Sequence, residues 1–220
     1  MKRRTHTGSR RSAPAAAPPN RSPEVVGFIA AVLRQMDHAA NLVDVARQKA
    51  ALDRLPLAEV DRIIRLLREA NAAGRRIFVC GNGGNAAHFA TDLGKGSSLA
   101  MPRPFKVLSM ADNVSWMTAI GNDYSFDEVF VRQLENHAEP GDLLLLSSVS
   151  GSSPNLVAAA RWAKEHGLVT IALVGGKRGQ VAEHADHLLV VEDTHYGRVE
   201  DAQMTMLHMF CYTFMEKVEG

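Results

Sequence analysis

The sequence has few cysteines and no long apolar run, and each absence excludes a class of protein. Its 220 residues include two cysteines, Cys80 and Cys211, both within apolar patterns. This usage is typical of small buried side chains in a reducing compartment rather than of a disulfide framework. No run of about 18 apolar residues could span a bilayer, and the first residues lack the apolar stretch of a secretory signal. We therefore expect a cytoplasmic protein with no membrane partner.

Acidic residues are missing from the first 22 residues, where six Lys or Arg lie. The rest of the chain has 19 basic and 24 acidic residues, a net charge of −5. Because surfaces that bind nucleic acid carry clustered basic residues, the net negative charge of residues 23–220 argues against a nucleic-acid partner. Pro14, Pro18 and Pro19 interrupt any helix. We expect residues 1–22 to be a disordered basic tail and residues 23–220 to form a single domain with an N-terminal helical extension.

Helical and strand-like patterns alternate along the chain. Apolar residues recur at helical spacing from Pro23 to Met36 and again from Leu57 to Ala73. A last helical pattern, from Val199 to Val218, predicts a long closing helix. Between them lie short apolar runs whose spacing predicts parallel strands joined by helices, an α/β fold. The runs are Ile77–Cys80, Lys106–Ser109, Leu143–Ser147, Val169–Val174 and Leu188–Val191.

Two turns that follow predicted strands carry the residues expected of an anion site. The first, residues 81–85, is rich in glycine, which lets backbone N–H groups approach an anion but also serves as a mere tight connection. The second, residues 147–155, carries five serine hydroxyls before a helix. One helix cap needs one hydroxyl, whereas a phosphate takes several donors at a helix N-terminus. The surplus favours a phosphate site at the carboxyl ends of the strands.

Four side chains on two predicted helices have a spacing that suits metal binding or proton transfer. His88 and Asp92 stand four residues apart and so share one helix face. Glu200 and His208 lie two turns apart on the closing helix, separated by about 80° around its axis. A histidine, with an ordinary pKa of about 6.5, is suited to proton transfer. A lone histidine on an apolar helix is more often structural, so spacing alone leaves the role of His208 open.

The order of these motifs resembles that of the SIS-domain phosphoheptose isomerases. The motifs are Gly81–Gly84, His88–Ala90, Gly121–Asp123, Ser150–Asn155 and Val199–Asp201 with His208. The resemblance runs from about Ser22 to the end of the sequence. It implies a flavodoxin-like three-layer sandwich with a five-stranded parallel sheet, N-terminal helices and a long C-terminal helix. It also implies a homotetramer whose active sites lie at subunit interfaces.

The activity that the resemblance implies is an aldose–ketose isomerisation of a phosphorylated sugar. The implied reaction converts sedoheptulose 7-phosphate to D-glycero-D-manno-heptose 7-phosphate through an enediol. The serine turn grips the phosphate, the glycine turn lines the same pocket, and side chains at a strand end are candidates for the sugar hydroxyls. The candidate substrate-binding residues are Asn82, Gly83, Asn85, Asp112, Asn113, Ser148, Ser150, Ser153 and Glu200.

The resemblance also assigns the proton carriers and a metal. Asp92 and His208 transfer protons, and zinc, one per subunit, polarises the carbonyl. A carboxylate held tightly by a metal is a poorer base, so Asp92 is open to either role. The implied zinc ligands are His88, Asp92, Glu200 and His208.

Two features of the sequence depart from the family pattern. Fewer residues separate the glycine turn from His88 than in the family, where a phosphate-contacting serine occupies the place of Asn85. Asp92 stands where the heptose enzymes carry the longer glutamate. The same family contains non-catalytic proteins that bind the replication initiator DnaA or sense a phosphosugar, and fold alone does not separate these alternatives. The presence of His88, Glu200 and His208 favours the enzyme.

Overall fold

The computed structural model describes residues 45–216. The predicted tail, residues 1–22, and the helical pattern from Pro23 to Met36 lie outside the described residues. None of the helices within residues 45–216 is long and apolar enough to cross a membrane. The helices are α2 (Val45–Leu52), α3 (Leu57–Ala73), α4 (Gly84–Thr91), α5 (Ser98–Ala100), α6 (Val114–Asp123), α7 (Val131–His137), α8 (Pro154–Glu165) and α9 (Tyr196–Met215). A π-helical turn, η1 (Asp92–Ser97), and two 3₁₀ turns, η2 (Phe126–Glu128) and η3 (Gln180–His184), join them.

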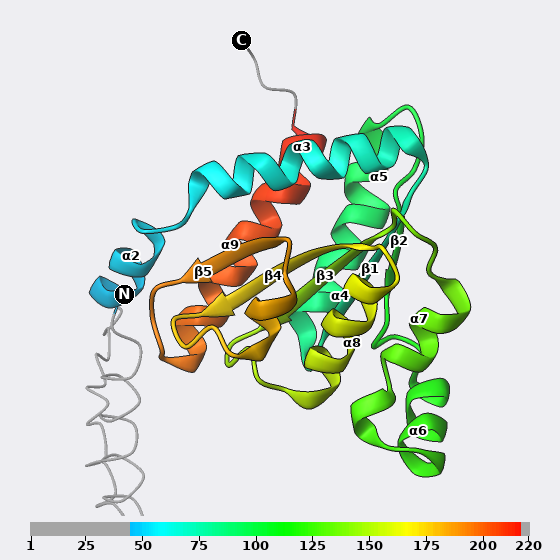
Figure 1. Ribbon diagram of the computed structural model, residues 1–220. Coiled ribbons are helices and arrows are strands. Elements are labelled where there is room, and N and C mark those ends of the chain that lie inside the picture. The colour runs from blue at the N-terminus through cyan, green and yellow to red at the C-terminus, as the bar shows by residue number, and fades with distance from the viewer. Residues whose placement is uncertain (1–44, 217–220) are drawn as a thin grey trace, which may run out of the picture. The chain divides into compact units, whose positions relative to one another are not determined.

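The strands form one sheet of five parallel strands in the order β2-β1-β3-β4-β5, as Figure 1 shows. The chain runs outward from β1 to β2 and then returns to β3 on the other side of β1, so the topological switch point lies between β1 and β3. All five predicted strands are confirmed. Their bounds are β1 (Arg76–Gly81), β2 (Lys106–Ser109), β3 (Leu143–Ser148), β4 (Val169–Gly175) and β5 (His187–Val191).

Helices cover both faces of the sheet, which is why the strands are apolar almost throughout. Val79 and Leu145 belong to a core shared with α3, α4 and α9. Phe78 and Leu144, their neighbours along the strands, belong to a second core shared with α6, α7 and α8. Alternate residues of a strand point to opposite faces, so the sheet is the middle layer of a three-layer sandwich. The predicted fold class is confirmed.

The long closing helix α9 lies against the face of the sheet that also carries α4. Val199, Gln203, Met206, Phe210 and Phe214 are buried at intervals of three or four residues, so one stripe of the helix faces the core. The predicted helix is confirmed, beginning slightly earlier than the apolar pattern. Because α4 and α9 pack together, the side chains on their adjoining faces meet.

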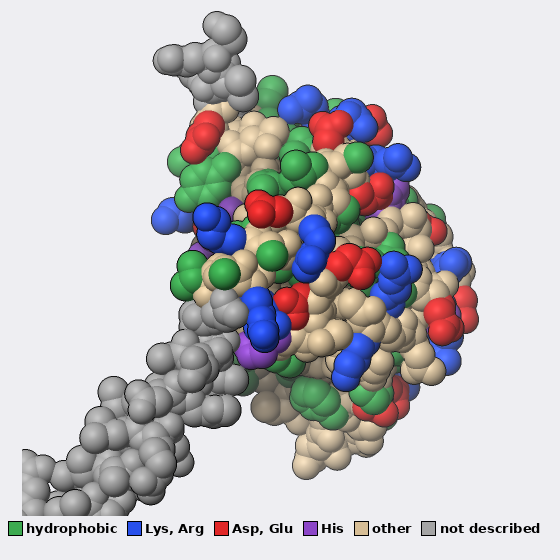
Figure 2. All heavy atoms as spheres, turned by 90° about the vertical axis from the view of Figure 1, so that its left-hand side faces the viewer, with side chains coloured by type: hydrophobic (Ala, Val, Ile, Leu, Met, Phe, Trp, Pro, Cys, Tyr) green, Lys and Arg blue, Asp and Glu red, His purple; other side chains and the backbone are tan. Residues whose placement is uncertain are grey.

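Figure 2 shows one face of the molecule, on which Lys and Arg side chains are interspersed with Asp and Glu. No continuous basic stripe forms on the described part of this face.

Candidate functional site

A pocket opens at the carboxyl ends of β1 and β3, at the switch point of the sheet. Residues of the glycine turn (81–85) and of the serine turn (147–153) line it, and the first turns of α9 close a third side. Register places Gly81 beside Ser147, so the two turns leave the sheet next to each other. The two turns predicted to bind an anion thus share one pocket.

Three helices begin beside this pocket. Residues near the starts of α4, α8 and α9 all line it, and these helices begin at Gly84, Pro154 and Tyr196. A helix N-terminus presents unpaired backbone N–H groups and a partial positive charge. Among the described residues that line the pocket, none is Lys or Arg. The groups that this pocket offers to an anion are therefore backbone dipoles and hydroxyl donors rather than cationic side chains.

The three predicted phosphate-binding serines all line the pocket. The Ser148 Oγ accepts a hydrogen bond from the Gly151 N–H at 3.1 Å, and the Ser150 Oγ accepts one from the Ser152 N–H at 3.2 Å. Both oxygens act as acceptors, so both hydroxyl protons remain for a ligand. Ser153 is at the N-cap position of α8 but makes no side-chain capping bond. The hydroxyls therefore exceed what the turn needs for its own structure.

Asn85 and Glu200 join two walls of the pocket. The Asn85 Nδ2 donates to the Glu200 backbone carbonyl at 3.2 Å, and both residues line the pocket. This bond links the first turn of α4 to the first turns of α9. Gly83, also predicted, lines the pocket with an extended backbone.

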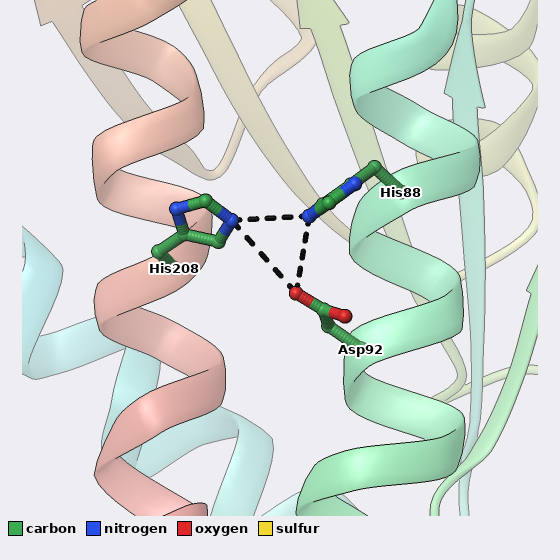
Figure 3. Close-up of side chains that lie close together, drawn as sticks. All are labelled: His88, Asp92 and His208. Carbon is green, nitrogen blue, oxygen red and sulfur yellow. Dashed lines mark hydrogen bonds and ion pairs between the residues drawn. The ribbon is translucent and has the colours of Figure 1, made fainter. Parts of the chain in front are cut away.

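His88, Asp92 and His208 meet between α4 and α9, one face of each helix contributing to the group (Figure 3). The two Nε2 atoms lie 3.1 Å apart, the His88 Nε2 lies 3.2 Å from the Asp92 Oδ2, and the His208 Nε2 lies 3.8 Å from the same oxygen. The side chains of His88 and His208 are 50% and 41% exposed. One chain suffices to assemble these three residues, and the group faces solvent.

The three ligand atoms suit a zinc ion. Zinc binds histidine nitrogen and carboxylate oxygen at about 2.0–2.2 Å in tetrahedral geometry, which places two ligand atoms about 3.3 Å apart. The observed separations of 3.1, 3.2 and 3.8 Å are close to that spacing. Burial raises the pKa of the neighbouring Cys211 thiol to about 12, and the charge of Asp92 adds to this effect. The group of ligand atoms found among the described residues contains two imidazole nitrogens and one carboxylate oxygen, and no cysteine sulfur.

Three predicted residues lie apart from the group of His88, Asp92 and His208. Glu200 lines the pocket and does not join the three ligand atoms. Asn113 caps α6 by accepting a hydrogen bond from the Trp116 N–H. Asp112 accepts one from the Ser109 hydroxyl. Neither Asp112 nor Asn113 lines the pocket between the glycine and serine turns.

Gln203, which belongs to none of the motifs predicted from the sequence, is buried in the wall of the pocket. Its Oε1 accepts from the Ser147 hydroxyl at 3.2 Å, and its Nε2 donates to the backbone carbonyls of Ser148 and Leu173 at 3.3 and 3.0 Å. These bonds tie α9 to the ends of β3 and β4. A polar residue on the otherwise apolar stripe of α9 was the sequence signal that could have identified it.

A charged pair fixes the start of α9. The Arg198 guanidinium donates to both carboxylate oxygens of Asp193, at 2.7 and 3.0 Å, and the two side chains are 15% and 12% exposed. These hydrogen bonds, with a further bond from the His195 N–H, lower the pKa of Asp193 to about 2. The pair holds the turn from which Tyr196 and Glu200 reach the pocket.

The amino-acid sequence matches the SIS domain family model over residues 42–175. It is 41% identical to a phosphoheptose isomerase of Mycobacterium tuberculosis (strain ATCC 25177 / H37Ra) over 139 residues, 62% of this chain and 70% of that protein. It is 38% identical to a phosphoheptose isomerase of Nitratidesulfovibrio vulgaris over 157 residues, 69% of this chain and 75% of that protein.

The fold is similar to that of solved structures of phosphoheptose isomerases. A phosphoheptose isomerase of Neisseria gonorrhoeae has a TM-score of 0.73 and 28% identity, and the match covers 82% of this chain and 97% of that one. A phosphoheptose isomerase of Francisella tularensis has a TM-score of 0.74 at 23% identity, covering 84% of this chain and 99% of that one, and it supports the fold alone.

Proposed function

The chain belongs to the SIS domain family, and on that premise we propose that it is a phosphoheptose isomerase. The reaction interconverts sedoheptulose 7-phosphate and D-glycero-D-manno-heptose 7-phosphate through an enediol. A single observation carries the proposal: His88 of α4 and His208 of α9 meet at Asp92, the first residue of η1, and the first turns of α4 and α9 line a serine-rich pocket. Chemistry that moves a proton between adjacent carbons needs two proton carriers beside an anchored substrate.

The pocket between the glycine and serine turns is our proposed phosphate site. Ser148, Ser150 and Ser153 supply hydroxyl donors there, and the starts of α4, α8 and α9 supply N–H groups and dipoles. Glu200 lines the side nearer α9, where its carboxylate would accept hydrogen bonds from sugar hydroxyls and would repel a second phosphate. The serines and Glu200 would thereby bind opposite ends of the substrate and fix its orientation in the pocket.

Asp92 and His208 are the proposed proton carriers. One removes the proton from the carbon next to the carbonyl and the other delivers it to the neighbouring carbon, while the oxygens exchange a proton. The Asp92 Oδ2 lies 3.2 Å from the His88 Nε2 and 3.8 Å from the His208 Nε2, so the two proposed carriers are close enough to act on adjacent carbons of one substrate. His88 orients the carboxylate of Asp92 through the 3.2 Å contact.

The spacing of the three ligand atoms fits a divalent metal, and we propose zinc, held by His88, Asp92 and His208. The metal supplies Lewis-acid polarisation of the substrate carbonyl and stabilises negative charge on the adjacent oxygens. The carboxylate of Asp92 serves as ligand or as base, and Glu200 is positioned toward the substrate rather than within the group of three.

We also propose that the protein works as a homotetramer in the cytoplasm. The tetramer, with sites near subunit boundaries, comes from the family resemblance. The cytoplasmic location rests on the two buried cysteines, which are free thiols of the kind usual in a reducing compartment.

The test is incubation of the purified protein with sedoheptulose 7-phosphate in D₂O, with and without zinc. We expect one solvent deuteron to enter the carbon next to the carbonyl and a new aldose phosphate to appear by NMR. A panel of ketose phosphates of other chain lengths tests the substrate. If no sugar exchanges a proton or isomerises in the presence of zinc, the isomerase proposal is wrong and the non-catalytic alternative stands.

A further inference from the structure

We propose that Asn155 is a positioning residue that locks the glycine turn to the start of α8, and so sets the spacing of the two anion-binding walls. The inference rests on the proposed phosphate site. Asn155 does not line the pocket, and it acts through Asn82, which does. The lock consists of two side-chain amides facing each other across 73 residues of sequence.

The two amides exchange hydrogen bonds. The Asn82 Nδ2 donates to the Asn155 Oδ1 at 3.0 Å, and the Asn155 Nδ2 donates to the Asn82 Oδ1 at 2.7 Å. Asn155 is 1% exposed, whereas Asn82 is exposed at the rim of the pocket. A buried amide whose N–H group faces another N–H group, or whose oxygen faces another oxygen, destabilises the fold. Because Asn155 is buried, its amide and that of Asn82 must therefore be oriented so that each N–H faces an oxygen.

A third bond fixes which way both amides point. The Asn155 Oδ1 also accepts the backbone N–H of Leu156 at 3.0 Å, and only an oxygen can accept there. The other end of the Asn155 amide must then be the N–H donor, and its partner atom on Asn82 must be the oxygen. The start of α8 therefore dictates the orientation of Asn82, and one remaining N–H of Asn82 is left for a ligand.

The glycine turn needs such a tether because little else packs against its tip. A Cβ added at Gly83 or at Gly84 would meet nothing within 4 Å. At Gly81, by contrast, an added Cβ would lie 2.9 Å from the Ala86 Cβ, so the turn is packed tightly where it leaves the strand. The turn is therefore held at its start by packing around Gly81 and at its end by the bond from Asn85 to α9. Between these two points, the hydrogen bonds between Asn82 and Asn155 hold the turn.

The lock is tested by a double-mutant cycle. The variants are Asn155→Ala, Asn82→Ala and both together, and the readouts are the dissociation constant of inorganic phosphate and the kcat and KM for sedoheptulose 7-phosphate. We expect each single change to weaken phosphate binding about tenfold, and the double change to weaken it no further, because either change opens the same lock. The KM should rise while kcat changes little, because the proton carriers lie farther along α4 and α9.

Two further variants separate the lock from local effects. Asn155→Ser keeps a hydroxyl that can accept the Leu156 N–H but cannot reach Asn82, and it should weaken phosphate binding as Asn155→Ala does. Asn136→Ala removes an exposed amide of α7 whose partner is the Arg132 carbonyl, and it should leave binding unchanged. Because Asn82 is exposed, water can take its place beside the Asn155 amide, so Asn82→Ala should fold even where an Asn155 variant does not.

The outcomes are distinct from those that decide the isomerase proposal, since phosphate binding is measured without turnover. Losses that simply add in the double variant would mean that Asn82 contacts the ligand independently, and the inference would be overturned. It would also be overturned by normal binding in Asn155→Ala, or by a wild-type protein that binds no phosphate. A protein that shows the coupled loss but does not isomerise the sugar would keep the lock and refute the enzyme.

Discussion

At the scale of single residues, Asp92 is the residue that joins the two histidines, since its carboxylate lies close to both His88 and His208. Asp92→Asn keeps the size of the side chain and removes its charge and basicity. We expect kcat to fall by about 10²–10⁴-fold, the usual contribution of a proton-transfer group, and zinc binding to weaken. Deuterium exchange and zinc titration measure the two effects.

The matched control for this change is Asp61→Asn on α3. Asp61 is an exposed aspartate in an ion pair with Arg65, and exposed pairs contribute little to stability. Full exchange activity in Asp92→Asn would remove Asp92 from the reaction and leave it as a structural acid.

The residues that the sequence identified are those whose chemistry is visible in a motif. His88 and Asp92 share a helix face by spacing alone, and the serines are crowded into one turn. Asn155 and Gln203 were not recognised, because a buried amide is identified by its partners and these lie far away in sequence. That Glu200 lies apart from the other three depends on how α9 is rotated against α4, which the sequence pattern does not fix.

At the scale of elements, the serine turn depends on one glycine. Gly151 has a φ of +64°, and an added Cβ would overlap the carbonyl of Arg178. Gly151→Ala should lower the free energy of unfolding by about 1–3 kcal/mol and weaken phosphate binding, because the turn must shift to make room. Denaturant unfolding and phosphate titration measure both effects.

Gly84→Ala is the matched control for stability. An added Cβ at Gly84 would meet nothing within 4 Å, and alanine is a better helix former than glycine in the first turn of α4. We expect unchanged or slightly raised stability. Equal losses in both variants would contradict the assignment of strain to Gly151.

The pair at the start of α9 gives a prediction about pH. Because the pKa of Asp193 is lower in the folded protein than its ordinary value of 3.8, the ionised carboxylate stabilises the fold above that value. The stabilisation is lost as the pH falls toward about 2. Asp193→Asn should lower the unfolding free energy by about 1–3 kcal/mol at pH 7.

The difference between wild type and Asp193→Asn should shrink as the pH is lowered through this range, measured by denaturant unfolding at several pH values. A difference that stays constant down to the acid limit would show that the charge of Asp193 is not the source of the stability.

The elements themselves were largely predictable. The strands follow from short apolar runs, and α3 follows from its apolar spacing with the same bounds, Leu57–Ala73. The π turn η1 was not predicted, because a single wide turn leaves no periodic pattern in the sequence. An added Cβ at Gly94 in this turn would lie 2.9 Å from the Val107 Cγ1, so Gly94 permits close packing on β2.

At the scale of the whole molecule, a metal that binds only the folded state should raise stability. With free zinc at about 100 times its dissociation constant, the expected gain is about 2.7 kcal/mol, and a chelator should reverse it. His88→Ala should abolish the gain, measured as the shift in unfolding temperature. His166→Ala, at an exposed histidine at the end of α8, should keep it. An equal shift in both variants would place the zinc elsewhere.

The absence of Lys and Arg from the described lining of the pocket has a consequence for selectivity. Long cationic chains lose conformational freedom when they close on a ligand, at about 0.5–1.5 kcal/mol each, whereas helix starts and short serines are already in place. The proposed phosphate site would therefore bind the phosphoryl group of any sugar phosphate with the same affinity and without induced fit. Discrimination between one monosaccharide and another must then come from the opposite end of the substrate, which we propose to contact Glu200.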